Sequence, residues 1–402
     1  MRVNKAYAMG FAVFLALITV KSAALTVDHY LFLHFIRTVL LGFAGILTAY
    51  IALAFIARSV NATVLIPVFI HVVLVVWGLL LSLIFGGFSF FNAINTSSLI
   101  LSFFVTMTFA GVIQQTKYGK DVITNNSFLR VYFTLQLIVV FILAFFQEGF
   151  PYYLGFQVSS EAKDFYSQGF THLFSLSLIF FTFAAFSKSK TNLFYLGASV
   201  LSFALMILGG ARGEVIIAVF VLLIFSLRRS RFHHLAFGSL CLVLLMPVLT
   251  ANIDLDQIVL FERFLVMLDG DFGSRDKLLF SAMDLLAAEP VCFAMGCGFN
   301  YFENYYGHHA PGSYPHSTIV EMAISFGFLV TIIMVLLALI KLSHLYFSPN
   351  TKGALVPIIA YELLRLQKSG SILDPTGISL LIVLAYQGGQ LLAQSTRKAE
   401  IS

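Results

Sequence analysis

Charged residues are scarce in this sequence of 402 residues. Asp, Glu, Lys and Arg make up 11% of it, whereas soluble globular proteins carry roughly 25%. A soluble fold of this length could not cover its surface with so few charges. The low charge, the 59% hydrophobic content and the mean hydropathy of +0.93 together exclude soluble, disordered, fibrous and nucleic-acid-binding classes. We therefore expect an all-α, polytopic membrane protein.

Several chemical signatures are also missing. The sequence contains no Walker-type Gly-rich loop and no H-E-x-x-H motif. The adjacent His308 and His309, with His316, do not form a usual metal-ligand pattern, so no metal and no cofactor are expected. There is no internal repeat, no low-complexity tract and no pair of related halves. The chemistry should therefore depend on a few polar side chains.

The three cysteines carry little information at this level. Cys241 lies in an apolar run, and Cys292 and Cys297 lie five residues apart in a polar segment. If that segment is extracytoplasmic, a disulfide between the two is possible. We favour the alternative, two unpaired buried thiols.

A bilayer-spanning helix needs about 20 apolar residues. Twelve apolar runs approach that length and fall at 7–25, 38–57, 64–85, 98–113, 131–146, 171–187, 192–209, 214–227, 235–250, 318–340, 354–366 and 377–393. The first run resembles a signal peptide, but a retained helix fits the eleven runs that follow. We expect nine spans in residues 1–250, a large loop at 251–317 and three spans in 318–402, all within one integral membrane domain.

The positive residues indicate the orientation of these spans. With the N-terminus inside, cytoplasmic segments hold fifteen of the 24 Lys and Arg residues, as the positive-inside rule requires. The clearest anchors are Lys188 with Lys190 and the run 228–231. Segments 147–170 and 251–317 then lie outside. The second should contain a helix near 275–289, from its apolar spacing, and an ordered loop at 296–315.

Two arginines stand out on the outer side. Arg212 follows Gly209 and Gly210 between two spans, and Arg275 follows Gly273-Ser274 at the start of the predicted loop helix, which Ser274 could cap. A polar residue at membrane depth is a functional candidate by default. The simpler alternative for Arg212 is an interfacial arginine paired with Glu214, and for Arg275 a solvated loop residue.

His316 is the third candidate, in a Tyr314-Pro-His-Ser-Thr turn before the tenth run. Free amides at such a helix start favour anions, although a single interfacial histidine is more often structural. Glu321, Glu214, Arg263 and Tyr314 complete the candidate substrate-binding set. A sugar-stacking wall or a simple aromatic belt would explain four tyrosines, Tyr301, Tyr305, Tyr306 and Tyr314. We expect His71, Gln136 and the Glu362/Arg365 pair to make helix–helix contacts.

The three candidates form a chemically consistent set. Guanidinium groups hold phosphate oxygens bidentately and stay charged, and a histidine can take a proton from a hydroxyl. The set suits a lipid-linked phosphate or pyrophosphate donor that is attacked by a hydroxyl. Lipid linkage is natural on a side of the membrane without nucleotides.

The motifs resemble those of the O-antigen polymerase (Wzy) and O-antigen ligase superfamily of bacterial surface-glycan enzymes. The resemblance rests on Gly210-Ala-Arg-Gly213, Gly273-Ser-Arg275, the segment 296–302 and His316-Ser-Thr318 leading to Glu321 and Gly327. It implies a metal-independent, inverting glycosyltransferase of the GT-C type that uses an undecaprenyl-pyrophosphate-linked oligosaccharide. Arg212 and Arg275 would hold the pyrophosphate, and His316 would assist the acceptor hydroxyl.

The departure of this chain from the ligases favours a polymerase. Ligases usually carry His-Asn and then Leu-Gln, where this chain has His-Ser and Val320-Glu321. The resemblance places the site at the periplasmic face of the bacterial inner membrane, among lipids, with a chain-length regulator and a flippase as further partners. The alternatives are an O-antigen ligase acting on lipid A-core and a flippase for lipid-linked oligosaccharides.

Overall fold

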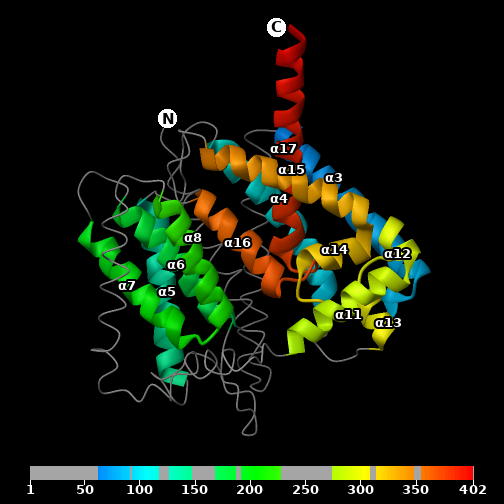
Figure 1. Ribbon diagram of the computed structural model, residues 1–402. Coiled ribbons are helices and arrows are strands. Elements are labelled where there is room, and N and C mark those ends of the chain that lie inside the picture. Colours follow the sequence, from blue (N-terminus) through cyan, green and yellow to red (C-terminus); the bar gives the residue numbers. More distant parts are fainter. Residues whose placement is uncertain are drawn as a thin grey trace. The chain divides into compact units, whose positions relative to one another are not determined.

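The computed structural model describes residues 62–90, 93–116, 126–146, 168–186, 192–227, 274–307, 314–347 and 355–401, which form helices joined by short turns. No strand occurs among them (Figure 1). The predicted runs 7–25, 38–57 and 235–250 lie outside these residues, as do most of 147–170 and Arg263.

Four described helices are long and apolar enough to cross a membrane. They contain the segments Val64–Ile84, Gln168–Ala185, Phe328–Phe347 and Thr376–Ser395. Two shorter apolar helices cover Ser98–Ile113 and Leu193–Leu208. The described residues are all-α, as expected, and their long apolar helices are compatible with a membrane protein.

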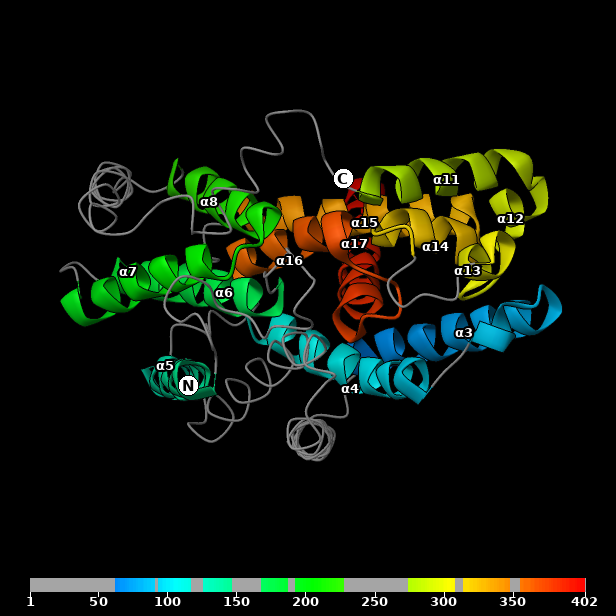
Figure 2. The ribbon, with the colours of Figure 1, turned by 90° about the horizontal axis from the view of Figure 1, so that it is seen from below.

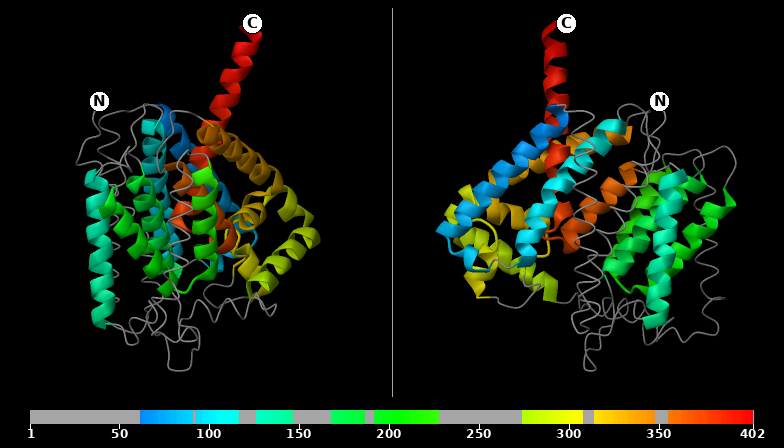
Figure 3. Two further views of the ribbon diagram at one scale, coloured as in Figure 1. Left: turned by 60° about the vertical axis from the view of Figure 1, so that its left-hand side comes forward. Right: turned by 180° about the vertical axis from the view of Figure 1, so that it is seen from behind.

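The chain divides into two compact units that are interleaved in the sequence. The first unit contains α5 (Asn126–Phe146), α6 (Gln168–Ala185), α7 (Leu193–Leu208), α8 (Arg212–Leu227) and the first part of α16 (Leu355–Ser369). Helix α6 packs against α5, α7 and α8 (Figure 3). It is buried along almost its whole length, from Gly169 to Ala185.

Polar side chains connect the helices of this unit. Thr182 of α6 hydrogen-bonds Ser199 of α7 at 2.7 Å, and the Gln136 amide of α5 donates to Ser202 of α7 at 3.0 Å. Such bonds are common where helices associate within a bilayer, because buried polar groups find no water there. The predicted helix–helix role of Gln136 is confirmed.

The second unit contains α3 (Ala62–Ile84), the 3-10 helix η1 (Gly87–Phe90), α4 (Ala93–Thr116), α11 (Ser274–Ala288), α12 (Pro290–Met295), α13 (Tyr301–Tyr306), α14 (Thr318–Phe326), α15 (Phe328–Phe347), the end of α16 and α17 (Pro375–Ile401). Helix α17 packs against α3, α4 and α15. The short helices α11 to α14 form a group beside α3 (Figures 1 and 2). His71 of α3 contacts Thr106 and Ser102 of α4, which confirms its predicted interhelical role.

The apolar run 318–340 is two helices instead of the one span predicted. Gly327 separates α14 from α15 with a φ of +87°, and a β-carbon there would clash with the carbonyl oxygen of Ala294. A glycine accepts this conformation and this close approach where other residues do not. The candidate span therefore starts at Phe328, and α14 precedes it.

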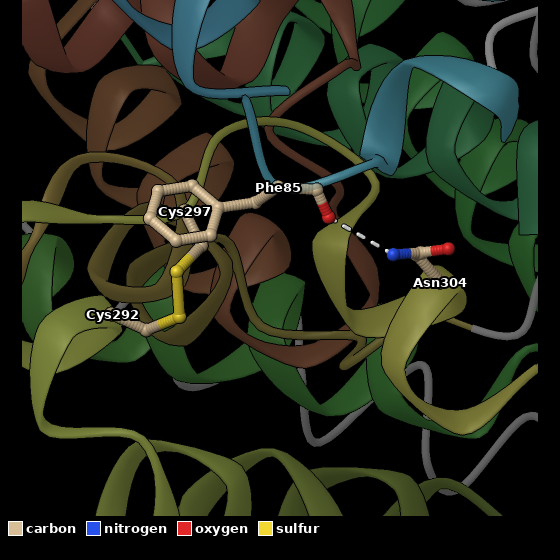
Figure 4. The surroundings of a disulfide bond; sticks show 4 residues. All are labelled: Phe85, Cys292, Cys297 and Asn304. Carbon is tan, nitrogen blue, oxygen red and sulfur yellow. Dashed lines mark hydrogen bonds between the residues drawn. A yellow bond between two sulfur atoms is a disulfide. The ribbon is translucent and has the colours of Figure 1, made fainter. Parts of the chain in front are cut away.

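The loop helix predicted at 275–289 is confirmed as α11. The ordered loop expected at 296–315 is more structured than predicted, because it contains α13. Cys292 and Cys297 form a disulfide, with their Cα atoms 4.9 Å apart, so the preference for two unpaired thiols was wrong (Figure 4). The pairing depends on the turn at Gly296, which has a φ of +84° and brings Cys297 back toward α12.

Candidate functional site

The turn between α7 and α8 places Arg212 at the first position of α8. Gly209 packs so closely against Thr171 of α6 that a β-carbon would clash, and Gly210 has a φ of +73°. The Ala211 amide donates to the Thr171 hydroxyl at 3.2 Å. The two glycines and Thr171 therefore fix the position of the turn from which the half-buried Arg212 side chain extends.

Glu214 lies in the first turn of α8 and is 1% exposed. Its carboxylate accepts a hydrogen bond of 2.8 Å from the Tyr361 hydroxyl of α16. The Tyr361 ring stacks on the His172 ring of α6, with centroids 5.7 Å apart. Glu214 thus connects α8 to α16 and fixes the helix that begins with Arg212.

The other two candidate residues belong to the second unit. Arg275 is the second residue of α11, and His316 lies just before α14. Helices α11 and α14 share a hydrophobic cluster of buried residues: Ala282, Leu285, Leu286, Cys292, Cys297, Phe302, Ala323 and Ile324. The elements that carry Arg275 and His316 are therefore held together by one core.

His316 has an unusual backbone conformation. Its φ is +55°, in the left-handed region, and its ring lies 4.2 Å from the ring of Tyr314. A residue with a β-carbon loses on the order of 1 kcal/mol in this region, and such residues gather at functional sites. This conformation adds support for His316 as a functional residue, beyond the support that its position in the sequence gives.

The turn that follows His316 is attached to the end of α16. The Thr318 hydroxyl donates to the Leu366 carbonyl at 3.0 Å, and the Ile319 amide donates to the Gln367 side-chain oxygen at 3.2 Å. The Ser317 hydroxyl reaches the same Gln367 oxygen at 3.4 Å. The Ile319 amide, expected to be open to an anion, is thus already occupied.

Glu321 is buried in the first turn of α14. Its carboxylate accepts hydrogen bonds from the Ser371 hydroxyl at 2.8 Å and from the Ile372 amide at 2.9 Å. Burial, with smaller effects of Glu303 and Asp374, raises the pKa of Glu321 to about 8. Burial also raises the pKa of Glu303 in α13 to about 7. Both acids lie before the span Phe328–Phe347 and can hold a proton near neutral pH.

The segment that binds Glu321 is itself held by an ion-pair network. Arg365 contacts Glu362 at 2.9 Å and Asp374 at 3.6 Å, and it donates to the Thr376 hydroxyl at 3.2 Å. The Asp374 carboxylate also accepts from the Thr376 amide at 3.0 Å, which caps the start of α17. Of the predicted helix–helix contacts of the Glu362/Arg365 pair, Arg365 makes one to α17 through Thr376, whereas its bond to Glu362 lies within α16. Asp-Pro-Thr at a helix start was the signal that could have drawn attention to this turn.

The tyrosines form two groups. Tyr301, Tyr305 and Tyr306 contact one another on α13, with ring centroids 6.0 and 5.0 Å apart along the series, whereas Tyr314 packs on His316. Tyr305 and Tyr306 are exposed. Within the described residues no group of His, Cys, Asp or Glu could hold a metal ion; His308 and His309 lie outside them.

Comparison with known proteins gives no match of any kind. No family model, no curated protein and no solved structure is similar to the chain. The functional argument therefore depends on the residues described above.

Proposed function

We propose that the chain is a polysaccharide polymerase of the bacterial inner membrane, an inverting glycosyltransferase acting at the periplasmic face. It would join oligosaccharide repeat units carried on undecaprenyl pyrophosphate. The observation that carries the proposal is His316, a titratable residue in a left-handed conformation whose element shares a core with the helix of Arg275. The resemblance of the motifs supplies the substrate class.

In the proposed reaction, an acceptor sugar hydroxyl attacks the anomeric carbon of the donor glycan. His316 takes the hydroxyl proton, and the bond between the anomeric carbon and the pyrophosphate oxygen breaks. Arg212 and Arg275 stabilise the negative charge of the departing undecaprenyl pyrophosphate. Glu321 holds the turn at Ser371 and Ile372, so we assign it a positioning role for the residues around His316.

The disulfide supports the proposed side of the membrane. Cys292 and Cys297 lie between Arg275 and His316 in the chain, and structural disulfides persist in the periplasm but are rare in the cytosol. A chain-length regulator and a flippase remain expected partners, and twelve spans with both termini inside remain the expected topology.

The test is chain extension by the purified protein in lipid nanodiscs with a defined lipid-linked repeat unit, with products separated by length. Replacement of Arg212, Arg275 or His316 by Ala should abolish extension, and Arg→Lys should also impair it because a single ammonium cannot bind bidentately. The exposed Arg130 of α5 and His344 of α15 provide matched controls, and Arg130→Ala and His344→Ala should stay active.

Cells lacking the protein separate the alternatives. A polymerase mutant should carry single repeat units on its lipopolysaccharide. Bare core, with long polymer still on the lipid carrier, would identify a ligase. Movement of lipid-linked oligosaccharide across vesicles without elongation would identify a flippase.

A further inference from the structure

Helix α12 is short, uncharged and largely exposed. Its six residues, Pro290–Met295, include no charged side chain, and of these only Cys292 is buried. Val291, Phe293 and Met295 are 50%, 43% and 56% exposed. Apolar surface in contact with water is unfavourable in proportion to its area. Such a surface indicates an apolar neighbour.

The buried side of α12 is attached firmly to α14. The disulfide joins Cys292 to Cys297, and the Cys297 amide donates to the Ile324 carbonyl at 2.7 Å. Gly296 packs against the Ser325 carbonyl so closely that no β-carbon would fit. Figure 4 shows the disulfide beside Phe85, at the end of α3. The exposure of α12 is therefore a property of a fixed element.

The exposed surface of α12 continues that of a membrane span. The Phe293 ring stacks on the Phe328 ring, with centroids 4.8 Å apart and planes 14° apart. Phe328 is the first residue of the candidate span Phe328–Phe347, which has only 22% of its residues buried. Leu329, Ile333 and Leu336 of that span are 65%, 47% and 53% exposed. Acyl chains that cover α15 would also meet α12.

The backbone next to α12 is suited to membrane depth. Gly296 to Asn300 lack regular structure but are buried within the protein, the condition under which irregular backbone is tolerated in a bilayer. Gly298 packs against the backbone of Gly78 and Ser82 in the span α3, and the Ser82 hydroxyl donates to the Phe299 carbonyl at 3.1 Å. The segment thus lies beside a span instead of above it.

We propose that α12 is seated among the lipid acyl chains of the leaflet in which α15 begins. Asp284 and Lys277, both exposed on α11, would remain at the water side. The exposed Tyr305 and Tyr306 of α13 suit the interface between them. The proposal concerns the seating of this segment and does not depend on the reaction proposed above.

The test uses tryptophan fluorescence of the full chain in nanodiscs. Trp77 is the single tryptophan of the sequence, so the Trp77→Phe variant has no tryptophan fluorescence of its own. Val291→Trp and Met295→Trp are added to it one at a time, with Asp284→Trp as the matched control on α11. Lipids brominated in their acyl chains should lower the emission of both α12 reporters about twofold, whereas aqueous iodide should affect only the control.

Two results would overturn the proposal. Quenching of the α12 reporters by iodide and not by brominated lipid would place the helix in water. Blue-shifted emission that neither quencher lowers would mean that protein, such as a second copy of the chain, covers it. In size-exclusion chromatography, both tryptophan variants should elute as the same single species as the Trp77→Phe parent. This control distinguishes a change in the position of α12 from misfolding.

Discussion

The starts of α8 and α14 are built from similar parts in different ways. Each helix follows a residue with a positive φ, and each has a buried glutamate in its first turn. Glu214 of α8 accepts a hydrogen bond from Tyr361 of α16, and Glu321 of α14 accepts one from Ile372 in the turn after α16. At α8 the left-handed residue is Gly210, and the candidate Arg212 has an ordinary helical backbone. At α14 the left-handed residue is the candidate His316 itself.

This difference separates packing from function. Glycine adopts a positive φ at little cost, so Gly210 turns the chain without strain next to Gly209, which makes the close contact with Thr171. His316 has a β-carbon, and its conformation must be maintained by the surrounding contacts of Ser317, Thr318 and Glu321. The start of α14 should therefore respond more strongly than the start of α8 to the loss of its glutamate.

The largest expected effect is that of Glu321→Ala. It leaves the Ile372 amide and the Ser371 hydroxyl without their acceptor, which should cost about 3 kcal/mol of stability. Thermal unfolding in nanodiscs measures the loss. Ser371→Ala removes one of the two bonds to Glu321, together with the bond that the Ser371 hydroxyl accepts from the Leu373 amide, and should cost less, about 1–2 kcal/mol. Equal losses for the two variants would contradict the anchoring role of the carboxylate.

The pH dependence should come next in size. Because burial raises the pKa of Glu321 to about 8 from its ordinary 4.5, the folded chain keeps a proton that the unfolded chain releases. Stability is then greatest in mild acid and falls as the pH rises toward 8. The melting temperature should decline over that range, and less steeply in Glu321→Gln. An unchanged slope in that variant would exclude Glu321 as the source; the remaining slope should reflect Glu303.

At α8, Tyr361→Phe should have a smaller effect. It removes the hydroxyl that donates to Glu214 and should cost about 1 kcal/mol, the usual net contribution of a hydrogen bond. A cycle of Tyr361→Phe with Glu214→Gln measures the coupling. Additive losses would show that the bond contributes nothing. The exposed Tyr305 is a control, and Tyr305→Phe should leave the melting temperature unchanged.

The smallest and most specific effect concerns the two positive φ angles. His316→Gly should be about 1 kcal/mol more stable than His316→Ala, because glycine relieves the left-handed backbone. Gly210→Ala should be less stable than the parent by about the same amount. Both His316 variants should lack chain extension. A His316→Gly variant no more stable than His316→Ala would argue against backbone strain at this residue.

Local pattern was sufficient to predict much of the fold. The apolar spacing at 275–289 predicted α11, and the interhelical roles of His71 and Gln136 followed from polar residues in apolar runs. The role of Glu321 could not be predicted in this way, because its partners Ser371 and Ile372 lie 50 and 51 residues further along the chain. Nothing in the sequence near Ile319 indicated that Gln367 would occupy its amide.

By itself, the sequence predicted a helical membrane protein and where many of its helices form, since hydropathy and helical spacing are properties of neighbouring residues. The tertiary structure decided the break at Gly327, the pairing of Cys292 with Cys297 and the left-handed backbone of His316. Each depends on chain segments that meet only after folding. The clearest case is Phe299, whose carbonyl accepts a hydrogen bond from Ser82 across 217 residues and brings a loop segment alongside the candidate span α3.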